Sequence, residues 1–226
     1  MSERTEATDF LYPFIEGDEH DAGALLIELT ASAEAKAAES ARLRETTLEA
    51  VGAELTAAGA AMAERFGRGG QLFVFGNGGS ATDARAVTAR FVKPPTGRPL
   101  PARNLAADSA VLTALGNDVG FDLVFSRQLI AHARPDDIAF GLSTSGNSQN
   151  LLAAFAEARR KRMLTVGLAG YDGGRMATSG DVDHRLVVRS TSVHRIQETQ
   201  AALVLALWTA VQAHLTQDHL TQDHLT

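Results

Sequence analysis

Cysteine is absent from this sequence of 226 residues, which excludes disulfide bonds and thiolate metal sites. The absence fits a reducing compartment, and we expect a cytoplasmic protein. Long apolar runs are also missing, since none approaches the roughly 20 residues that cross a bilayer. The acidic N-terminus, MSERTEATDFLYPFIEGDEHD, lacks the basic-then-apolar order of a secretory signal. We therefore expect no membrane partner.

Positive charge is in short supply: 21 Lys and Arg residues against 27 Asp and Glu residues give a net charge of −6. Such a chain has no overall field that draws it to nucleic acid phosphates, so no direct nucleic-acid binding is expected. An anionic ligand must be held by local geometry instead. Hydrophobic residues make up 45% of the chain, which is enough for a packed globular core.

Three regions are predicted along the chain. Residues 1–20 are acidic and interrupted by proline and glycine, so we expect a flexible arm. Residues 21–214 are predicted to form a single domain with an N-terminal helical extension, because residues 21–66 are rich in Ala, Leu and Glu without proline. Residues 215–226 carry a five-residue repeat, HLTQD, whose period fits neither a helix face nor a strand face, and we predict a disordered tail.

The helix predicted over residues 21–66 carries an apolar stripe. Its members recur at spacings of three, four or seven: Leu48, Val51, Leu55, Met62 and Phe66. Such a stripe needs a partner surface, which is either the rest of the chain's own domain or another subunit. Periodicity alone leaves both open.

Short apolar runs alternate with helical segments in the rest of the chain. Strands are predicted at residues 71–76, 103–106, 138–143, 164–170 and 184–190, and helices at about 80–92, 109–116, 121–133, 148–161 and 194–214. This alternation predicts an α/β fold in which a parallel sheet is covered by helices on both faces, a three-layer αβα sandwich.

Two polar turns follow predicted strands, and we call them the first loop, GNGGS (76–80), and the second loop, STSGNS (143–148). Ligands of open parallel sheets bind beyond the carboxyl ends of the strands. Glycine lets the backbone approach an anion at a helix N-terminus, and Ser, Thr and Asn supply donors. Either loop alone also fits an ordinary helix cap. The pair indicates a phosphosugar site, because packing requires neither.

The first loop with the next residue, GNGGSA, also matches the dinucleotide fingerprint G-x-G-x-x-A. That fingerprint requires an acidic residue about 20 positions further on, and residues 84–107 contain none. A nucleotide-cofactor enzyme is therefore the weaker hypothesis, although Arg98 or Arg103 is available to face a ribose phosphate.

Both loops, together with GND (116–118), GYDGG (170–174) and RIQE (195–198), occur in the order seen in the phosphoheptose isomerases. The chain resembles these sedoheptulose-7-phosphate isomerases of the sugar-phosphate isomerase (SIS) domain family over about residues 45–212. It also resembles a non-enzymatic relative, the replication-initiator-associating protein. The resemblance implies a sugar-phosphate ligand and a homotetramer, in which the terminal helices form a central bundle and each site is shared between subunits.

The resemblance also implies which residues bind substrate. They are Asn77, Gly78 and Ser80 in the first loop, Ser143, Thr144, Ser145 and Ser148 around the phosphate, Asp118 near the sugar chain, and Gln197 pointing in from the last helix. Without the resemblance, Asp118 fits a turn and Gln197 fits an exposed helix position.

The catalytic positions depart from the family's pattern. Isomerisation moves a proton between adjacent carbons and needs a base, paired with an acid or a metal. The resemblance places the family's His, Glu and second His at Ala86, Arg90 and Leu205, and of the set only Gln197 is kept. We expect that the family's zinc site is lost and that the protein has no cofactor.

Substitute groups are few. His194 and Glu198 are candidate catalytic acids or bases, although both also fit surface positions at a helix start. Arg90 is able to bind a carboxylate or a second phosphate. We favour a sugar-phosphate-binding or regulatory homologue, with a protein partner as one possibility, over an active aldose–ketose isomerase that uses the substitutes.

Overall fold

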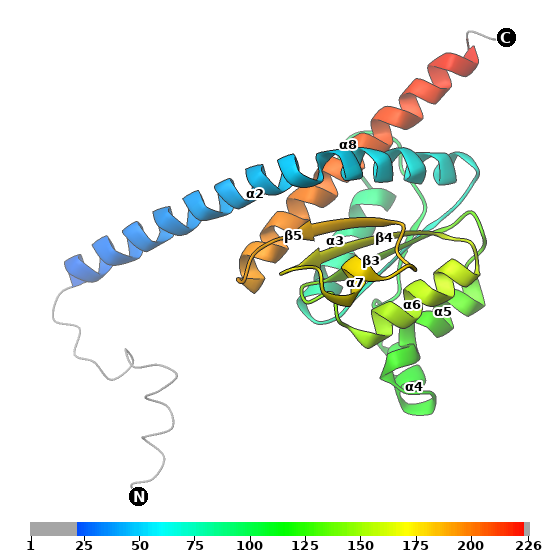
Figure 1. Cartoon of the computed structure of the whole chain (residues 1–226), viewed down its shortest axis with the longest axis horizontal. Coiled ribbons are helices and arrows are strands. Elements are labelled where there is room, and N and C mark those ends of the chain that lie inside the picture. Colours follow the sequence, from blue (N-terminus) through cyan, green and yellow to red (C-terminus); the bar gives the residue numbers. More distant parts are fainter. Residues whose placement is uncertain (1–21, 224–226) are drawn as a thin grey trace, which may run out of the picture. The chain divides into compact units, whose positions relative to one another are not determined.

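The computed structural model describes residues 22–223. Its elements alternate as the sequence predicts (Figure 1). They are α2 (Ala22–Gly67), β1 (Leu72–Gly76), α3 (Gly79–Val92), β2 (Ala102–Asn104), α4 (Ser109–Asp118), η1 (Phe121–Leu123), α5 (Val124–His132), β3 (Ile138–Ser143), α6 (Gln149–Arg160), β4 (Leu164–Gly170), α7 (Gly174–Thr178), β5 (His184–Val188) and α8 (Val193–Asp223). The short helix α7 has no counterpart among the predicted elements, and the predicted arm lies outside the described residues.

Internal contacts divide the chain into two units, Met1–Ala41 and Arg42–Thr226. Of the first unit, the structure describes the N-terminal part of α2, where Leu26, Ile27 and Leu29 are exposed. The second unit holds the rest of α2 and every other described element.

The five strands form one parallel sheet in the order β2-β1-β3-β4-β5. β1, β3 and β4 are buried along their whole length, which explains why they read as continuous apolar runs rather than alternating ones. The predicted strand 184–190 ends earlier, at Val188, so that Arg189 and Ser190 lie in the following loop.

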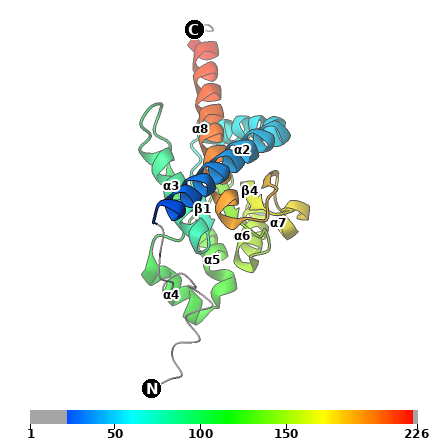
Figure 2. The same cartoon turned by 90° about the vertical axis from the view of Figure 1, so that its left-hand side faces the viewer.

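Two hydrophobic cores lie on opposite faces of this sheet. One joins the sheet to α2, α3 and α8, where Phe91 and Trp208 meet edge to face with ring centroids 5.0 Å apart. The other joins it to α5 and α6, where Phe75, Phe125 and Phe155 are fully buried. The views in Figures 1 and 2 show these helices on the two sides of the sheet. The predicted three-layer αβα fold is confirmed.

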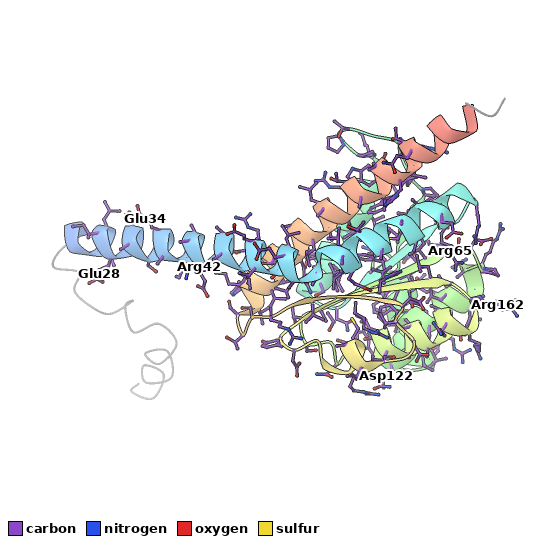
Figure 3. All side chains as sticks on the ribbon, turned by 45° about the horizontal axis from the view of Figure 1, so that its top comes forward. Glu28, Glu34, Arg42, Arg65, Asp122 and Arg162 are labelled. Carbon is purple, nitrogen blue, oxygen red and sulfur yellow. The ribbon has the colours of Figure 1, made fainter. Side chains whose placement is uncertain are left out.

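The apolar stripe of α2 is mostly covered by the chain itself. Leu55, Met62 and Phe66 are buried in the first of these cores, whereas Leu48 remains 37% exposed. At the C-terminal end of α2, the Arg65 guanidinium donates hydrogen bonds to the carbonyls of Pro135 (2.7 Å) and Arg162 (3.2 Å). Figure 3 labels Arg65 and Arg162. These bonds tie α2 to the loops that lead into β3 and β4.

The prediction of a disordered tail is wrong for most of its length, because α8 continues to Asp223. Extending a helix that is already nucleated costs far less than starting one, and Leu and Gln are good helix formers, so a repeat without an apolar stripe can still prolong α8. None of the described helices is long and apolar enough to cross a membrane.

Candidate functional site

The first and second loops lie side by side at the carboxyl edge of the sheet. They end β1 and β3, whose last residues pair in register, Gly76 with Leu142. The chain leaves β1 towards β2 on one side and returns to β3 on the other, so the crevice between these two strands is a topological switch point. The predicted convergence of the two loops is therefore what the structure shows.

A pair of amide side chains fixes this arrangement. The Asn77 Nδ2 donates to Oδ1 of Asn150, and the Asn150 Nδ2 donates to Oδ1 of Asn77, both at 2.9 Å. Asn150 is only 2% exposed. Because a buried amide without partners is costly, this reciprocal pair holds the first loop against the first turn of α6.

The helices that follow the two loops begin without side-chain caps. Ser148 occupies the cap position of α6 and Gly78 that of α3, and neither residue caps its helix through a side chain. At α4, by contrast, the Asp108 carboxylate accepts hydrogen bonds from the backbone N–H groups of Ala110 and Val111. The serines of the second loop therefore do not serve as ordinary caps, and two helix N-termini remain open to an anion.

Hydroxyl groups of the second loop organise the loop itself. The buried Ser143 Oγ accepts a hydrogen bond from the backbone N–H of Gly146 (3.0 Å) and lies 3.3 Å from the Ser148 Oγ. The Ser145 Oγ accepts one from the N–H of Asn147 (3.2 Å). Gly146 has a φ of 65°, so the turn uses the left-handed region that glycine favours.

The GYDGG turn, residues 170–174, braces the second loop from the side of β4. The N–H of Gly170 donates to the Thr144 carbonyl at 3.0 Å, and the N–H of Met176 donates to the Gly146 carbonyl at 2.9 Å. The contact is so close that a Cβ on Gly146 would lie 2.0 Å from the Gly173 carbonyl oxygen. This motif thus positions the second loop.

Gln197 reaches the first loop from α8, as the resemblance implies. A Cβ on Gly79 would lie 2.5 Å from its Nε2, and the same Nε2 donates to the Asp83 Oδ2 at 3.0 Å. Burial raises the pKa of Asp83, and the hydrogen bond from Gln197 opposes that increase. Sequence reasoning missed Asp83, although it is the one acid of α3 and follows Ser80 by nearly one helical turn.

The SIS domain model matches residues 37–170, more than half of the chain. The chain belongs to the SIS domain family. Phosphoheptose isomerases are among its relatives: that of Solidesulfovibrio magneticus is 45% identical over 165 residues, covering 70% of this chain and 78% of the relative, and that of Desulfovibrio desulfuricans is 47% identical over 167 residues, covering 73% and 78%.

Solved structures of phosphoheptose isomerases are also similar to this chain. The phosphoheptose isomerase of Neisseria gonorrhoeae superposes on this SIS domain with a TM-score of 0.76 and 34% identity, covering 82% of this chain and 99% of that one. The enzyme from Francisella tularensis gives a TM-score of 0.75 and 31% identity, covering 83% and 98%. The resemblance to the phosphoheptose isomerases is confirmed by these relatives.

The positions at which the resemblance places the family's catalytic residues lie on two neighbouring helices of this SIS domain. Ala86 is exposed and Arg90 is half-buried on α3, and Leu205 is 49% exposed on α8. Among the residues that the structure describes, no three His, Cys, Asp or Glu side chains gather so that they could hold a metal ion.

The predicted substitute groups and Asp118 lie at exposed positions. His194 is exposed in the first turn of α8, and the Glu198 carboxylate accepts two hydrogen bonds from the Arg195 guanidinium, at 2.9 and 2.8 Å. Asp118 is exposed at the end of α4, where it accepts a hydrogen bond from Asn117. The helix α4 packs mainly on η1 and α5.

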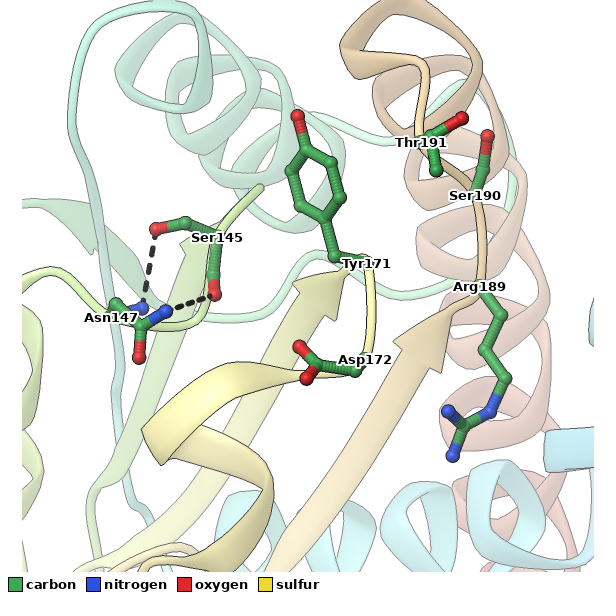
Figure 4. A pocket seen from close by; sticks show the side chains of 7 residues that line it. All are labelled: Ser145, Asn147, Tyr171, Asp172, Arg189, Ser190 and Thr191. Carbon is green, nitrogen blue, oxygen red and sulfur yellow. Dashed lines mark hydrogen bonds between the residues drawn. The ribbon is translucent and has the colours of Figure 1, made fainter.

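A cavity of about 630 Å³ opens beside the second loop of this SIS domain (Figure 4). Its lining comes from the loops that follow β3, β4 and β5: Ser145, Asn147, Tyr171, Asp172, Arg189, Ser190 and Thr191. We call it the β5-side pocket. No spacing in the sequence predicts this pocket, because three separate loops contribute to it.

Proposed function

We propose that this SIS domain binds a sugar phosphate between its first and second loops, and that it acts as a sensing or regulatory homologue of the phosphoheptose isomerases. The main support for this proposal is a pair of helix N-termini, those of α3 and α6, that have no side-chain caps. The hydrogen bonds between Asn77 and Asn150 hold the two next to each other. An anion is the natural partner of such N–H groups.

The same geometry suggests roles within the site. The phosphate would lie at the start of α6, where the hydroxyl groups of Ser145 and Ser148 and the backbone of Thr144 are within one turn. Ser80, buried at the start of α3, and Gln197 would face the sugar. The name of these relatives, phosphoheptose isomerase, supports a heptose phosphate as the first ligand to test.

The absence of turnover is proposed from chemistry. A proton cannot move between two carbons without a base near them. The resemblance places the family's His, Glu and second His at Ala86, Arg90 and Leu205, and none of these three side chains is a base of the kind that the family uses.

We also propose a homotetramer. The exposed Leu48 and Leu205 side chains on the two long helices support it, because apolar side chains on helices gain free energy when a partner covers them.

Thermal unfolding in the presence of sugar phosphates tests the binding proposal. Sedoheptulose 7-phosphate is expected to raise the midpoint in a concentration-dependent manner, because a ligand that binds only the folded state stabilises it by mass action. Ser148→Ala should reduce the shift, and Ser109→Ala, an exposed serine of α4, should leave it unchanged. A midpoint that does not move with any sugar phosphate would refute the proposal.

A second candidate function, sugar-phosphate isomerisation, is favoured by one observation. Asp83 has a raised pKa and touches Gln197 beside the first loop. A carboxylate with a raised pKa is a stronger base than an exposed one. Its contact with Gln197 makes Asp83 a further candidate for the substitute base, beside His194 and Glu198. Conversion of sedoheptulose 7-phosphate that is lost in Asp83→Asn would establish this alternative.

A further inference from the structure

The β5-side pocket lies on the far side of the second loop from the first loop. In the sheet, β3 has β1 on one side and β4 and β5 on the other. A phosphate at the second loop therefore has the proposed sugar site on its β1 side and the β5-side pocket on its other side. A phosphate monoester would fill only the first of these two spaces.

The size of the β5-side pocket exceeds what a single phosphate needs. About 630 Å³ is within the range of cavities that hold cofactor-sized ligands, roughly 300–1,000 Å³. The pocket shares Ser145 and Asn147 with the second loop, so a group bound there would be continuous with a phosphate at the loop.

The side chains of the pocket match the parts of a nucleoside diphosphate. Figure 4 shows Tyr171 and Asp172 between the second-loop residues and Arg189–Thr191. The Tyr171 ring, 37% exposed, offers a face on which a base can stack. Arg189 is exposed, has no ion-pair partner within the described chain and is suited to a second phosphate.

The backbone holds Tyr171 in an unusual conformation. Its φ of 52° lies in the left-handed region, which side chains other than glycine rarely adopt. Strained residues persist where the surroundings determine them, and they cluster at ligand sites. Next to it, the Asp172 Oδ1 accepts a hydrogen bond from the Gly174 N–H, which orients the carboxylate and leaves its other oxygen for a ribose hydroxyl.

We propose that the β5-side pocket binds the nucleoside of a nucleotide sugar, whose first phosphate lies at the second loop and whose second phosphate lies at Arg189. This inference rests on the proposed function, since it uses the same phosphate position, and it changes the ligand class from a phosphate monoester to a sugar linked through a diphosphate to a nucleoside. It differs from the dinucleotide hypothesis, which would place the nucleotide beyond β2.

Isothermal titration calorimetry of the full chain with ADP, UDP, inorganic pyrophosphate and sedoheptulose 7-phosphate tests this proposal. We expect ADP or UDP to bind at least about tenfold more tightly than pyrophosphate, because base stacking adds to the phosphate contacts. Tyr171→Ala should remove that advantage, and Tyr171→Phe, which keeps the ring, should retain it. Both variants keep a side chain at the same strained position, so both should remain folded.

The outcomes separate the two proposals. If sedoheptulose 7-phosphate binds and the nucleotides bind no better than pyrophosphate, the nucleoside site is refuted and the proposed function stands. If none of the four compounds binds, the nucleoside site is refuted, and the proposed function is refuted as well once no other sugar phosphate shifts the unfolding midpoint. Nucleotide binding that is unchanged in Tyr171→Ala would also contradict the assignment of the β5-side pocket.

Discussion

Asn77 and Asn150 illustrate how much can depend on one pair of side chains. Removing the Asn77 amide leaves the buried Asn150 amide without its partner, and the penalty for such a group is about 1–3 kcal/mol. We therefore expect Asn77→Ala to lower the free energy of unfolding by that amount in urea titrations. In a double-mutant cycle, Asn150→Ala should cost much less once Asn77 is already alanine. Fully additive effects would mean that the pair does not couple the loops.

The raised pKa of Asp83 should make the stability of the protein depend on pH. Its folded pKa lies above its usual value of 3.8, so folding disfavours the ionised form. The stability that protonated Asp83 contributes is fully present below pH 3.8, and it is lost as the pH rises through the folded pKa of Asp83. Asp83→Asn keeps an oxygen that can accept from Gln197 and removes the charge.

This variant should therefore be more stable than the parent near pH 7 by less than about 1 kcal/mol, because solvent screens a partly exposed group. The gain should disappear below pH 4, as followed by urea unfolding across this pH range. Asp118→Asn, at an exposed position, is the matched control and should change stability by no more than about 0.5 kcal/mol. A loss of stability in Asp83→Asn at pH 7 would show that the carboxylate is needed in its charged form.

Single residues also mark the limit of sequence reasoning. The two loops could be predicted, because each is a short polar motif directly after an apolar run. Asp83 could not, since its role depends on Gln197, which is 114 positions away in the sequence. For the same reason His194 and Glu198 could be named only as candidates, since their places at and next to RIQE do not show which way their side chains face.

At the scale of elements, the second loop and the GYDGG turn are expected to act as one rigid unit. Gly146 combines a positive φ with a Cβ position only 2.0 Å from the Gly173 carbonyl oxygen. Gly146→Ala should therefore lower the free energy of unfolding by about 3 kcal/mol in chemical denaturation, from backbone strain and steric overlap together. Gly180→Ala, which has no atom within 4 Å of its Cβ position, should be nearly neutral. Equal effects would show that the turn does not brace the loop.

Strands and helices were easier to predict than their ends. The buried strands β1, β3 and β4 stand out as apolar runs between glycine or serine turns. The five-residue helix α7 carries no periodic signal, since it is too short to show one. The C-terminal repeat is helical up to Asp223, which its period of five does not predict. The preceding turns of α8 nucleate the helix, so that the repeat only has to extend it.

For the molecule as a whole, we propose that function was changed on an unchanged fold. The α3 and α8 helices still lie together, as the Phe91–Trp208 and Asp83–Gln197 contacts show. Restoring the family's residues with Ala86→His, Arg90→Glu and Leu205→His should therefore create a Zn²⁺ site with Gln197. Competition with a chromophoric chelator should show zinc binding at least tenfold tighter than in the parent chain. Unchanged zinc affinity would mean that the two helices no longer present these positions to one ion.

NMR of ¹³C-labelled sedoheptulose 7-phosphate in the presence of the protein tests binding and turnover in one measurement. We expect saturable changes in the ligand signals that are weakened in Ser148→Ala, with no new signals over many hours. Aldose signals that grow with protein concentration would contradict the proposed absence of catalysis, and ligand signals that never change would contradict the two-loop site itself.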